Sequence, residues 1–111
     1  YQPDAVIIDI GTNDMNSGMN VSATFKSTYG TFLGVLRTKY PNAVIYCGSH
    51  EGNLSTDIQA VVTTAADSAH VKYILLSGAS HGACDGHLDA AGHQTYANLV
   101  VAAVKADLGW Q

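Results

Sequence analysis

The sequence predicts an α/β fold in which helices flank an open parallel sheet. Three short apolar runs each end at a glycine, a pattern typical of parallel strands that are buried on both faces. Stretches with the apolar spacing of an amphipathic helix follow each run. Strands and helices therefore alternate in the order β-α-β-α-β-α, and such a series forms a parallel sheet through right-handed crossovers.

The predicted strands cover residues 5–11 (AVIIDIG), 43–48 (AVIYCG) and 71–78 (VKYILLSG). Three strands are few for a sheet of this type, and edge strands as apolar as these would tend to pair with other chains. We therefore expect either that further strands come from outside these residues or that the residues form a minimal fragment of the fold.

Three helices are predicted from apolar positions that recur with helical spacing. The first covers residues 21–40 and is ended by Pro41. The second covers residues 56–69, and the third covers residues 90–108, with Gly109 just past its end. The predicted apolar faces consist of Phe25, Tyr29, Phe32, Leu33, Leu36 and Tyr40; of Ile58, Val61, Val62, Ala65 and Ala66; and of Tyr96, Leu99, Val100, Ala103, Val104 and Leu108.

The composition excludes several classes of protein. A length of 111 residues with 47% hydrophobic residues fits one small globular domain. The net charge is −4 with only five Lys and Arg residues, so neither nucleic acid nor a membrane surface is expected as a partner. No apolar run approaches the ~20 residues of a membrane-spanning helix. The charged fraction of 13% favours a secreted protein, because the polar residues are mostly Ser, Thr, Asn and Gly.

The chain has two cysteines, Cys47 and Cys84. Two cysteines allow a single pairing, but their positions in the sequence do not determine the geometry that a disulfide needs. One disulfide and two free thiols both remain open.

Polar residues gather in the three segments that follow the predicted strands. These segments are GTNDMNSGMN (11–20), GSHEGN (48–53) and GASHGACDGHLD (78–89). Parallel strands end at the same edge of a sheet, and open α/β sheets bind ligands beyond that edge. The sequence therefore predicts a functional site at the carboxyl ends of the strands.

The GTND segment has two interpretations. Gly11 lets the strand turn sharply, and the amide of Asn13 could donate a hydrogen bond to an oxyanion. Alternatively, the segment is an ordinary turn made of common turn-forming residues.

In the CDGHLDAAGH segment (84–93), His87 precedes the last helix and is free to act as a general base. Asp89 is expected to cap that helix with its carboxylate. His93 falls on the first helical turn, where packing or solvent contact is its expected role. Asp85 could orient the imidazole of His87 or point elsewhere.

A metal site is another interpretation of the same histidines and their neighbours. It would use side chains among His81, Cys84, Asp85, His87 and His93. Their spacing matches no compact zinc pattern, so no metal or other cofactor is expected. His50 and His81 have no assigned role.

With GTND at 11–14 and CDGHLDAAGH at 84–93, the chain resembles the SGNH hydrolase superfamily, also called GDSL-like esterases. The order PDAVIIDIGTND, LRTKYPNAVIY, the histidine block and a last helix closing on LGW is similar to carbohydrate esterase family two. Those enzymes are acetyl esterases that act on acetylated plant polysaccharides. The resemblance implies a flavodoxin-like sheet of the SGNH type, of which residues 1–111 are the carboxy-terminal part of one domain.

The resemblance also implies roles for particular residues. Asn13 would donate to the oxyanion, and His87 would be the general base that activates a serine. Gly11 and Asp14 would contact the substrate, which would be an acetylated carbohydrate or a small ester.

Three positions depart from the pattern of the superfamily. The aspartate usually found three residues before the histidine is Cys84 here, and Asp85 follows it. In family two a backbone carbonyl can orient the histidine instead, so a role for Asp85 stays open. Leu88 replaces the usual proline. Gly86 replaces the aromatic residue that often precedes the histidine, so that substrate contact is expected to be absent.

The nucleophile of the superfamily is a serine in a block after the first strand, and no such block is found here. The chain therefore resembles the superfamily from its third strand onward, and an amino-terminal chain or segment would supply the serine and further strands. Alone, the chain is expected to be inactive. A non-catalytic carbohydrate-binding or structural remnant of the fold is the alternative.

Four serines lie in the segments after the strands, and all are interpreted as turn residues: Ser17, Ser49, Ser77 and Ser80.

Overall fold

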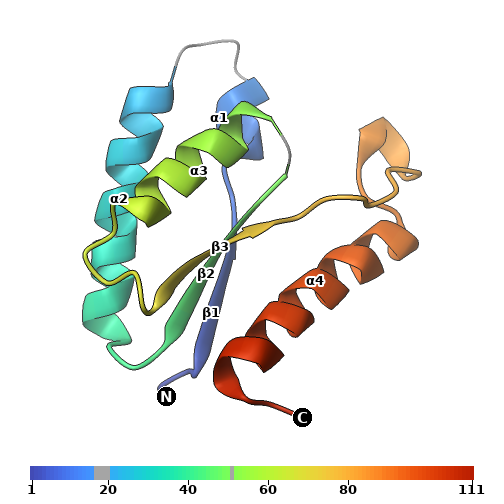
Figure 1. Cartoon of the computed structure of the whole chain (residues 1–111). Helices are drawn as coiled ribbons and strands as arrows, with labels where there is room; N and C mark the ends of the chain where they lie inside the picture. Colours follow the sequence, from blue (N-terminus) through green and yellow to red (C-terminus); the bar gives the residue numbers. More distant parts are fainter. Residues whose placement is uncertain (17–20, 51) are drawn as a thin grey trace. The chain divides into compact units, whose positions relative to one another are not determined.

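The computed structural model describes residues 1–16, 21–50 and 52–111, and it divides into two compact units, Tyr1–Leu75 and Leu76–Gln111. The first unit contains, in order, β1 (Ala5–Asp9), α1 (Thr12–Asn16), α2 (Ser22–Lys39), β2 (Val44–Ser49), α3 (Asn53–Thr63) and β3 (Val71–Leu75) (Figure 1). The second contains a short 3-10 helix, η1 (Cys84–Gly86), and α4 (Ala90–Leu108). Ser17 lies outside the described residues.

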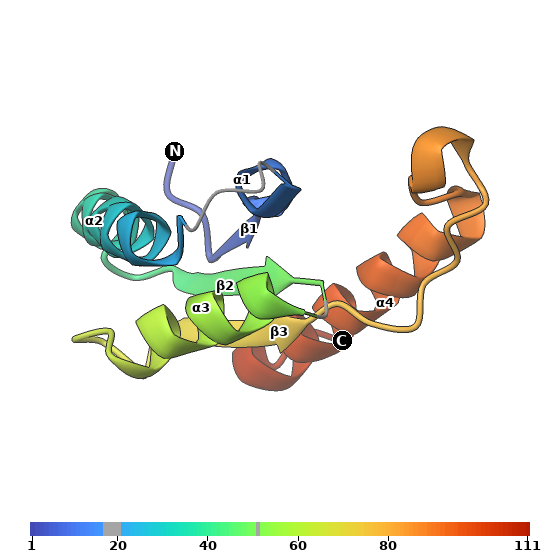
Figure 2. The ribbon, with the colours of Figure 1, turned by 90° about the horizontal axis from the view of Figure 1, so that it is seen from above.

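The three strands form one parallel sheet in the order β1-β2-β3. Figure 2 shows β2 between the other two strands. The predicted α/β class with an open parallel sheet is therefore confirmed, as is the alternation of strands and helices.

The core of the first unit lies between one face of the sheet and the helices α2 and α3. Successive side chains of a strand point to opposite faces of the sheet. Those of Ile8, Ile45, Cys47 and Val71 all point to the face that α2 and α3 cover. The strand register brings them together, because Ile8 pairs with Cys47 and Ile45 pairs with Val71. The helices contribute Phe25, Tyr29, Leu33, Leu54, Ile58, Val61 and Val62.

Of the three strands that the structure describes, only the central one is buried along its whole length. All six residues of β2 are buried, whereas Ile7 in β1 and Leu75 in β3 are 45% and 41% exposed. Burial on both faces was thus the wrong expectation for β1 and β3, because they are the two edges of the described sheet. Phe32, which was predicted on the buried face of α2, is also exposed at 39%.

The helix α3 differs most from its prediction. It begins at Asn53 and ends at Thr63, so Ala65 and Ala66 follow it and do not lie on its face. The hydroxyl of Thr64 donates to backbone carbonyls of the last turn. Asp67 then directs the chain into β3, because its carbonyl accepts hydrogen bonds from the backbone N–H groups of His70 and Val71.

The other two predicted helices have nearly the expected bounds. The helix α2 ends at Lys39, two residues before Pro41. The helix α4 has its predicted bounds, Ala90–Leu108, and Gly109 follows it in the left-handed conformation with φ of 67°. Among the described residues, no helix combines the length and the apolar character needed to cross a membrane.

Both cysteines are free thiols. Cys47 is buried in the core of the first unit, and this burial raises the pKa of its thiol to about 11. The thiol therefore stays protonated near neutral pH, where it behaves as a small apolar group. Cys84 is exposed at the start of η1.

Candidate functional site

The segments that follow β1 and β2 leave the sheet side by side, at the carboxyl ends of the strands. Asp9 at the end of β1 pairs with Gly48, and Ser49 pairs with Leu75 at the end of β3. A side-chain contact joins the first two segments, since Nε2 of His50 lies 3.7 Å from Oδ1 of Asp9. This contact is an ion pair when the imidazole is protonated. His50, which the sequence left without a role, is thus positioned by the neighbouring strand.

The turn after β1 requires glycine at position 11. Gly11 has φ of +113°, a backbone conformation that other residues rarely adopt. A Cβ atom there would lie 2.8 Å from a ring carbon of Phe25 and 3.0 Å from Leu54. The sharp turn expected at Gly11 is therefore confirmed, and it packs directly against the core.

The rest of the GTND segment is a short helix and not the simple turn that was the alternative interpretation. The backbone N–H of Asp14 donates to the carbonyl of Gly11 at 3.1 Å, and α1 runs from Thr12 to Asn16. Asn13 is exposed in this helix, and its amide has no hydrogen-bond partner among the described residues.

A largely apolar groove of about 450 Å³ lies beside this turn. Gly11 and Asp14 both line it, whereas Asn13 does not. The groove continues along α2, where Phe32 is exposed, and Ile10 at its other side is 51% exposed. Its full lining is Ile10, Gly11, Asp14, Val21, Thr24, Phe25, Thr28, Tyr29 and Phe32.

A small hydroxyl network lies under the end of β2. The phenol of Tyr73 is 3.0 Å from the hydroxyl of Ser49 and 2.6 Å from that of Ser55. Ser49 is completely buried. Its hydroxyl joins β2 to Tyr73 on β3, and the same phenol reaches α3 through Ser55, which agrees with a structural role for this serine.

In the second unit, the carboxylate of Asp89 organises the segment that precedes α4. It accepts hydrogen bonds from the backbone N–H of Gly92 at 2.8 Å and of Gly82 at 3.2 Å, and from the hydroxyl of Ser80. The bond from Ser80, followed by those from the backbone, lowers the pKa of Asp89 below its usual value. The predicted N-cap is therefore confirmed, and Ser80 is occupied by it.

The backbone around His87 is held by two hydrogen bonds, while its imidazole is exposed. The N–H of His87 donates to the carbonyl of Cys84 at 3.1 Å, and the N–H of Ala83 donates to the carbonyl of His87 at 3.2 Å. Neither ring nitrogen has a partner within the part of the chain that the structure describes. His87 lies outside α4, as predicted.

Asp85 is not hydrogen-bonded to His87. It has φ of 56° within η1, a left-handed conformation that few residues other than glycine adopt, and its side chain is exposed. The structure therefore provides no contact through which Asp85 would orient this imidazole.

His81 is the histidine of this segment that has a defined partner. Its Nδ1 lies 2.9 Å from the carbonyl oxygen of Gly86. A carbonyl oxygen can only accept, so Nδ1 carries the hydrogen. The sequence did not point to this contact, because nothing in the spacing of His81 and Gly86 marks them as partners.

The last histidine of this segment, His93, also lies apart from any cluster of the described residues that could bind a metal ion. His93 is exposed on the first turn of α4. Across the ranges 1–16, 21–50 and 52–111, no three side chains of His, Cys, Asp and Glu come together in a way that could hold a metal ion.

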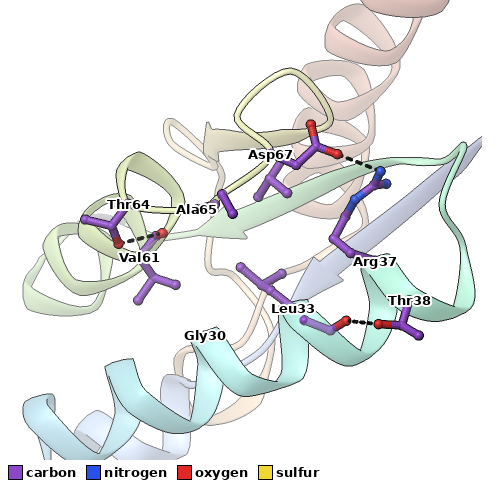
Figure 3. A pocket seen from close by; sticks show the side chains of 11 residues that line it. Gly30, Leu33, Arg37, Thr38, Val61, Thr64, Ala65 and Asp67 are labelled. Carbon is purple, nitrogen blue, oxygen red and sulfur yellow. Dashed lines mark hydrogen bonds and ion pairs between the residues drawn. The ribbon is translucent and has the colours of Figure 1, made fainter.

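A second cavity lies at the opposite end of the first unit. It measures about 530 Å³, and it is lined by residues of α2, of the end of α3 and the turn after it, and by Val71 of β3 (Figure 3). The guanidinium of Arg37 crosses it to Asp67 at 2.7 Å and also donates to the carbonyls of Tyr40, Pro41 and Ala43. His70 and then Arg37 lower the pKa of Asp67 below its usual value. These groups are occupied in holding the turn before β3.

The predicted site residues are divided between the two units. Gly11, Asn13 and Asp14 belong to the first unit, and Asp85 and His87 belong to the second. The positions of the units relative to each other are not determined. That these residues form one functional site at the carboxyl ends of the strands therefore stays a prediction.

Comparison with curated proteins gives two relatives, although no protein-family model matches the chain. Over 99% of its length, the chain is 27% identical to the cellulase/esterase CelE of Acetivibrio thermocellus. A stretch of 45 residues, 40% of the chain, is 44% identical to the acetylxylan esterase / glucomannan deacetylase of Cellvibrio japonicus. The chain covers 15% of the first protein and 13% of the second.

Solved structures extend this likeness to the three-dimensional level. A family two carbohydrate esterase from Clostridium thermocellum, solved with cellohexaose, matches 100% of the chain with a TM-score of 0.88 and 27% identity. A family two carbohydrate esterase from Cellvibrio japonicus matches 99% of the chain with a TM-score of 0.84 and 28% identity. The chain spans only 38% and 35% of these two structures.

Proposed function

The chain is homologous to the carbohydrate esterases of family two, an SGNH-type group, and we propose that it is the carboxy-terminal part of a secreted serine esterase that deacetylates carbohydrates. The observation that carries this proposal is the likeness over the whole chain at a TM-score of 0.88. Residues 1–111 would then be part of a single hydrolase domain. Secretion is part of the proposal because polysaccharide substrates are found outside cells.

The proposed reaction is acyl transfer through a serine that this chain does not supply. The serine hydroxyl attacks the acetyl carbonyl, and His87 takes its proton. His87 then gives the proton to the oxygen of the departing sugar, and a water molecule later releases acetate from the serine by the same route. The exposure of the His87 imidazole supports this role, because an incoming serine can reach it.

Asn13 would stabilise the negative charge that develops on the carbonyl oxygen during both steps. Its exposed amide, which has no partner among the described residues, supports the assignment. Gly11 and Asp14 would contact the substrate, and their place at the wall of the apolar groove supports that part of the proposal.

The remaining strands of the enzyme would pair with β1. This strand is an edge of the sheet, and the apolar side chains of Ile7, Ile10 and Phe32 are exposed along it and along the adjoining groove. An apolar edge of this kind invites pairing with a further strand. We propose that the amino-terminal part of the enzyme, which carries the serine, occupies it.

Substitution of His87 tests the proposal. In the complete enzyme, His87→Ala should lose most of the turnover of an acetylated xylo-oligosaccharide, because no other group takes the serine proton. His93→Ala is the matched control, since His93 is also exposed but lies on α4, and it should retain the activity. Release of acetate measures both. Equal losses in the two variants would contradict the role of His87.

The second candidate is a non-catalytic carbohydrate-binding remnant of the same fold. The lack of a hydrogen-bond partner for His87 among the described residues favours it, because a general base is normally oriented by such a partner. A serine-reactive phosphonate separates the two candidates. Labelling of the complete protein supports the esterase, whereas binding of an oligosaccharide without labelling supports the remnant.

A further inference from the structure

The imidazole of His81 is held in one tautomer. Its Nδ1–H donates to the carbonyl oxygen of Gly86 over 2.9 Å. In the neutral ring, Nε2 therefore keeps its lone pair and can only accept a hydrogen bond. This side chain is exposed, so the lone pair is accessible to a ligand.

The backbone on both sides of His81 is tied to the start of α4. Ser80 donates its hydroxyl to Asp89, and Gly82 donates its backbone N–H to the same carboxylate. Asp89 in turn caps α4 through Gly92. His81 is thus anchored at the residue before it, at the residue after it and at its own ring.

These contacts place the His81 ring beside the backbone that leads into His87. Gly86, whose carbonyl holds the ring, directly precedes His87 in the chain. The backbone bond from Ala83 to His87 closes the same segment. The ring of His81 therefore contacts the residue next to His87, so a substrate bound at His87 would have His81 in its neighbourhood.

We infer that His81 is a specificity-determining residue that accepts a hydrogen bond from a hydroxyl group of the sugar. The inference rests on the proposed function and extends it to the recognition of the sugar. A sugar hydroxyl is a suitable partner, since it can donate to a ring nitrogen whose orientation is already determined. The binding energy of such a contact is gained with little loss of side-chain freedom.

Two variants separate this role from a purely structural one. His81→Asn keeps a donor, because the side-chain NH2 can replace Nδ1–H against the carbonyl of Gly86, but it removes Nε2. His81→Ala removes both groups. If Nε2 binds the sugar, both variants should raise KM for an acetylated xylo-oligosaccharide about fivefold, the size expected for one neutral hydrogen bond. Their kinetics with 4-nitrophenyl acetate, which has no sugar, should be those of the unaltered enzyme.

Two results would overturn the inference. If His81→Asn restores the KM of the unaltered enzyme, the role of the ring is structural. If either variant lowers kcat on both esters, His81 acts in the chemistry and not in sugar recognition.

The affinity for a sugar, measured by calorimetry, tests the role of His81 independently of the esterase activity. Affinity for an unacetylated xylo-oligosaccharide requires no turnover, and His81→Asn should weaken it about fivefold. Failure to hydrolyse either ester would reject the esterase while this measurement still decides on His81. Equal affinity of the two proteins, or no binding by either, would overturn the inference.

Discussion

Single residues determine how each site segment runs. Gly11 is required by its positive φ and by its contact with Phe25. Gly92 has a similar part in the second unit, because a Cβ atom there would collide with the backbone carbonyl of Ser80. The first requirement was predictable, since a glycine at the end of a strand indicates a sharp turn. The second was not, because Ser80 and Gly92 come together only through the folded segment.

Asn13 provides a prediction at this scale. Asn13→Ala in the complete enzyme should lower kcat by roughly 10²–10³-fold, because the oxyanion would lose one hydrogen-bond donor. Asn42→Ala is the matched control, since Asn42 is also exposed but lies in the turn that precedes β2. Steady-state kinetics on an acetylated xylo-oligosaccharide measure the effect. An unchanged kcat for Asn13→Ala would remove this residue from the oxyanion site.

At the scale of elements, α4 and the segment before it act as one structure through Asp89. One carboxylate serves both as the N-cap of the helix and as the acceptor that holds Ser80 and Gly82. The histidine segment therefore has a defined conformation even though its side chains are largely exposed. The cap could be predicted because it acts over three residues, whereas the bonds to Ser80 and Gly82 span nine and seven residues.

Replacement of Asp89 should consequently loosen this segment in a pH-dependent way. The pKa of Asp89 is lowered in the folded protein, so its stabilising effect is complete above the unfolded value of about 3.9 and is lost as the pH falls through the folded value. Asp89→Ala should thus lower the melting temperature at pH 7, and the difference from the unaltered protein should shrink below about pH 4.

Thermal unfolding followed by circular dichroism at several pH values measures this effect. Asp107→Ala serves as the control, because Asp107 is exposed near the other end of α4 and makes no capping bond. A difference for Asp89→Ala that stays constant from pH 7 to pH 3 would show that the carboxylate charge does not contribute.

At the scale of the whole molecule, the core cluster of the first unit lies between α2, α3 and one face of the sheet, and β1 and β3 are the edge strands of the described sheet. The completely buried side chain of Ile58 joins α3 to the central strand. Stability of this unit should therefore depend on a few positions where the helices meet the sheet. The exposed apolar side chains at the β1 edge contribute little to it, which agrees with the proposal that another part of the enzyme covers them.

Ile58→Ala should accordingly lower the free energy of unfolding by about 2–5 kcal/mol, because it leaves a cavity in the core. Ile58→Val should cost about 0.5–1.5 kcal/mol. Val35→Ala is the control, since Val35 is 60% exposed on α2, and its effect should stay within about 0.5 kcal/mol. Urea unfolding of the protein measures all three. A cost for Ile58→Ala as small as that of Val35→Ala would contradict this account of the core.

The sequence by itself determined the class of fold, the order of its elements and the bounds of α4. It also determined the likeness to family two through the GTND and CDGHLDAAGH blocks. These features depend on helical and strand periodicity, on caps and on turn residues, all of which act between residues close together in the chain. Such local preferences are visible in the order of the amino acids.

Only the tertiary structure decided that β2 is central, that Phe32 is exposed beside the β1 edge, and that α3 ends before Ala65. It also decided the contacts that distinguish the histidines, His50 with Asp9 and His81 with Gly86. These outcomes depend on which segments the folded chain brings side by side. The periodicity of a single segment carries no information about its neighbours, so it could not predict them.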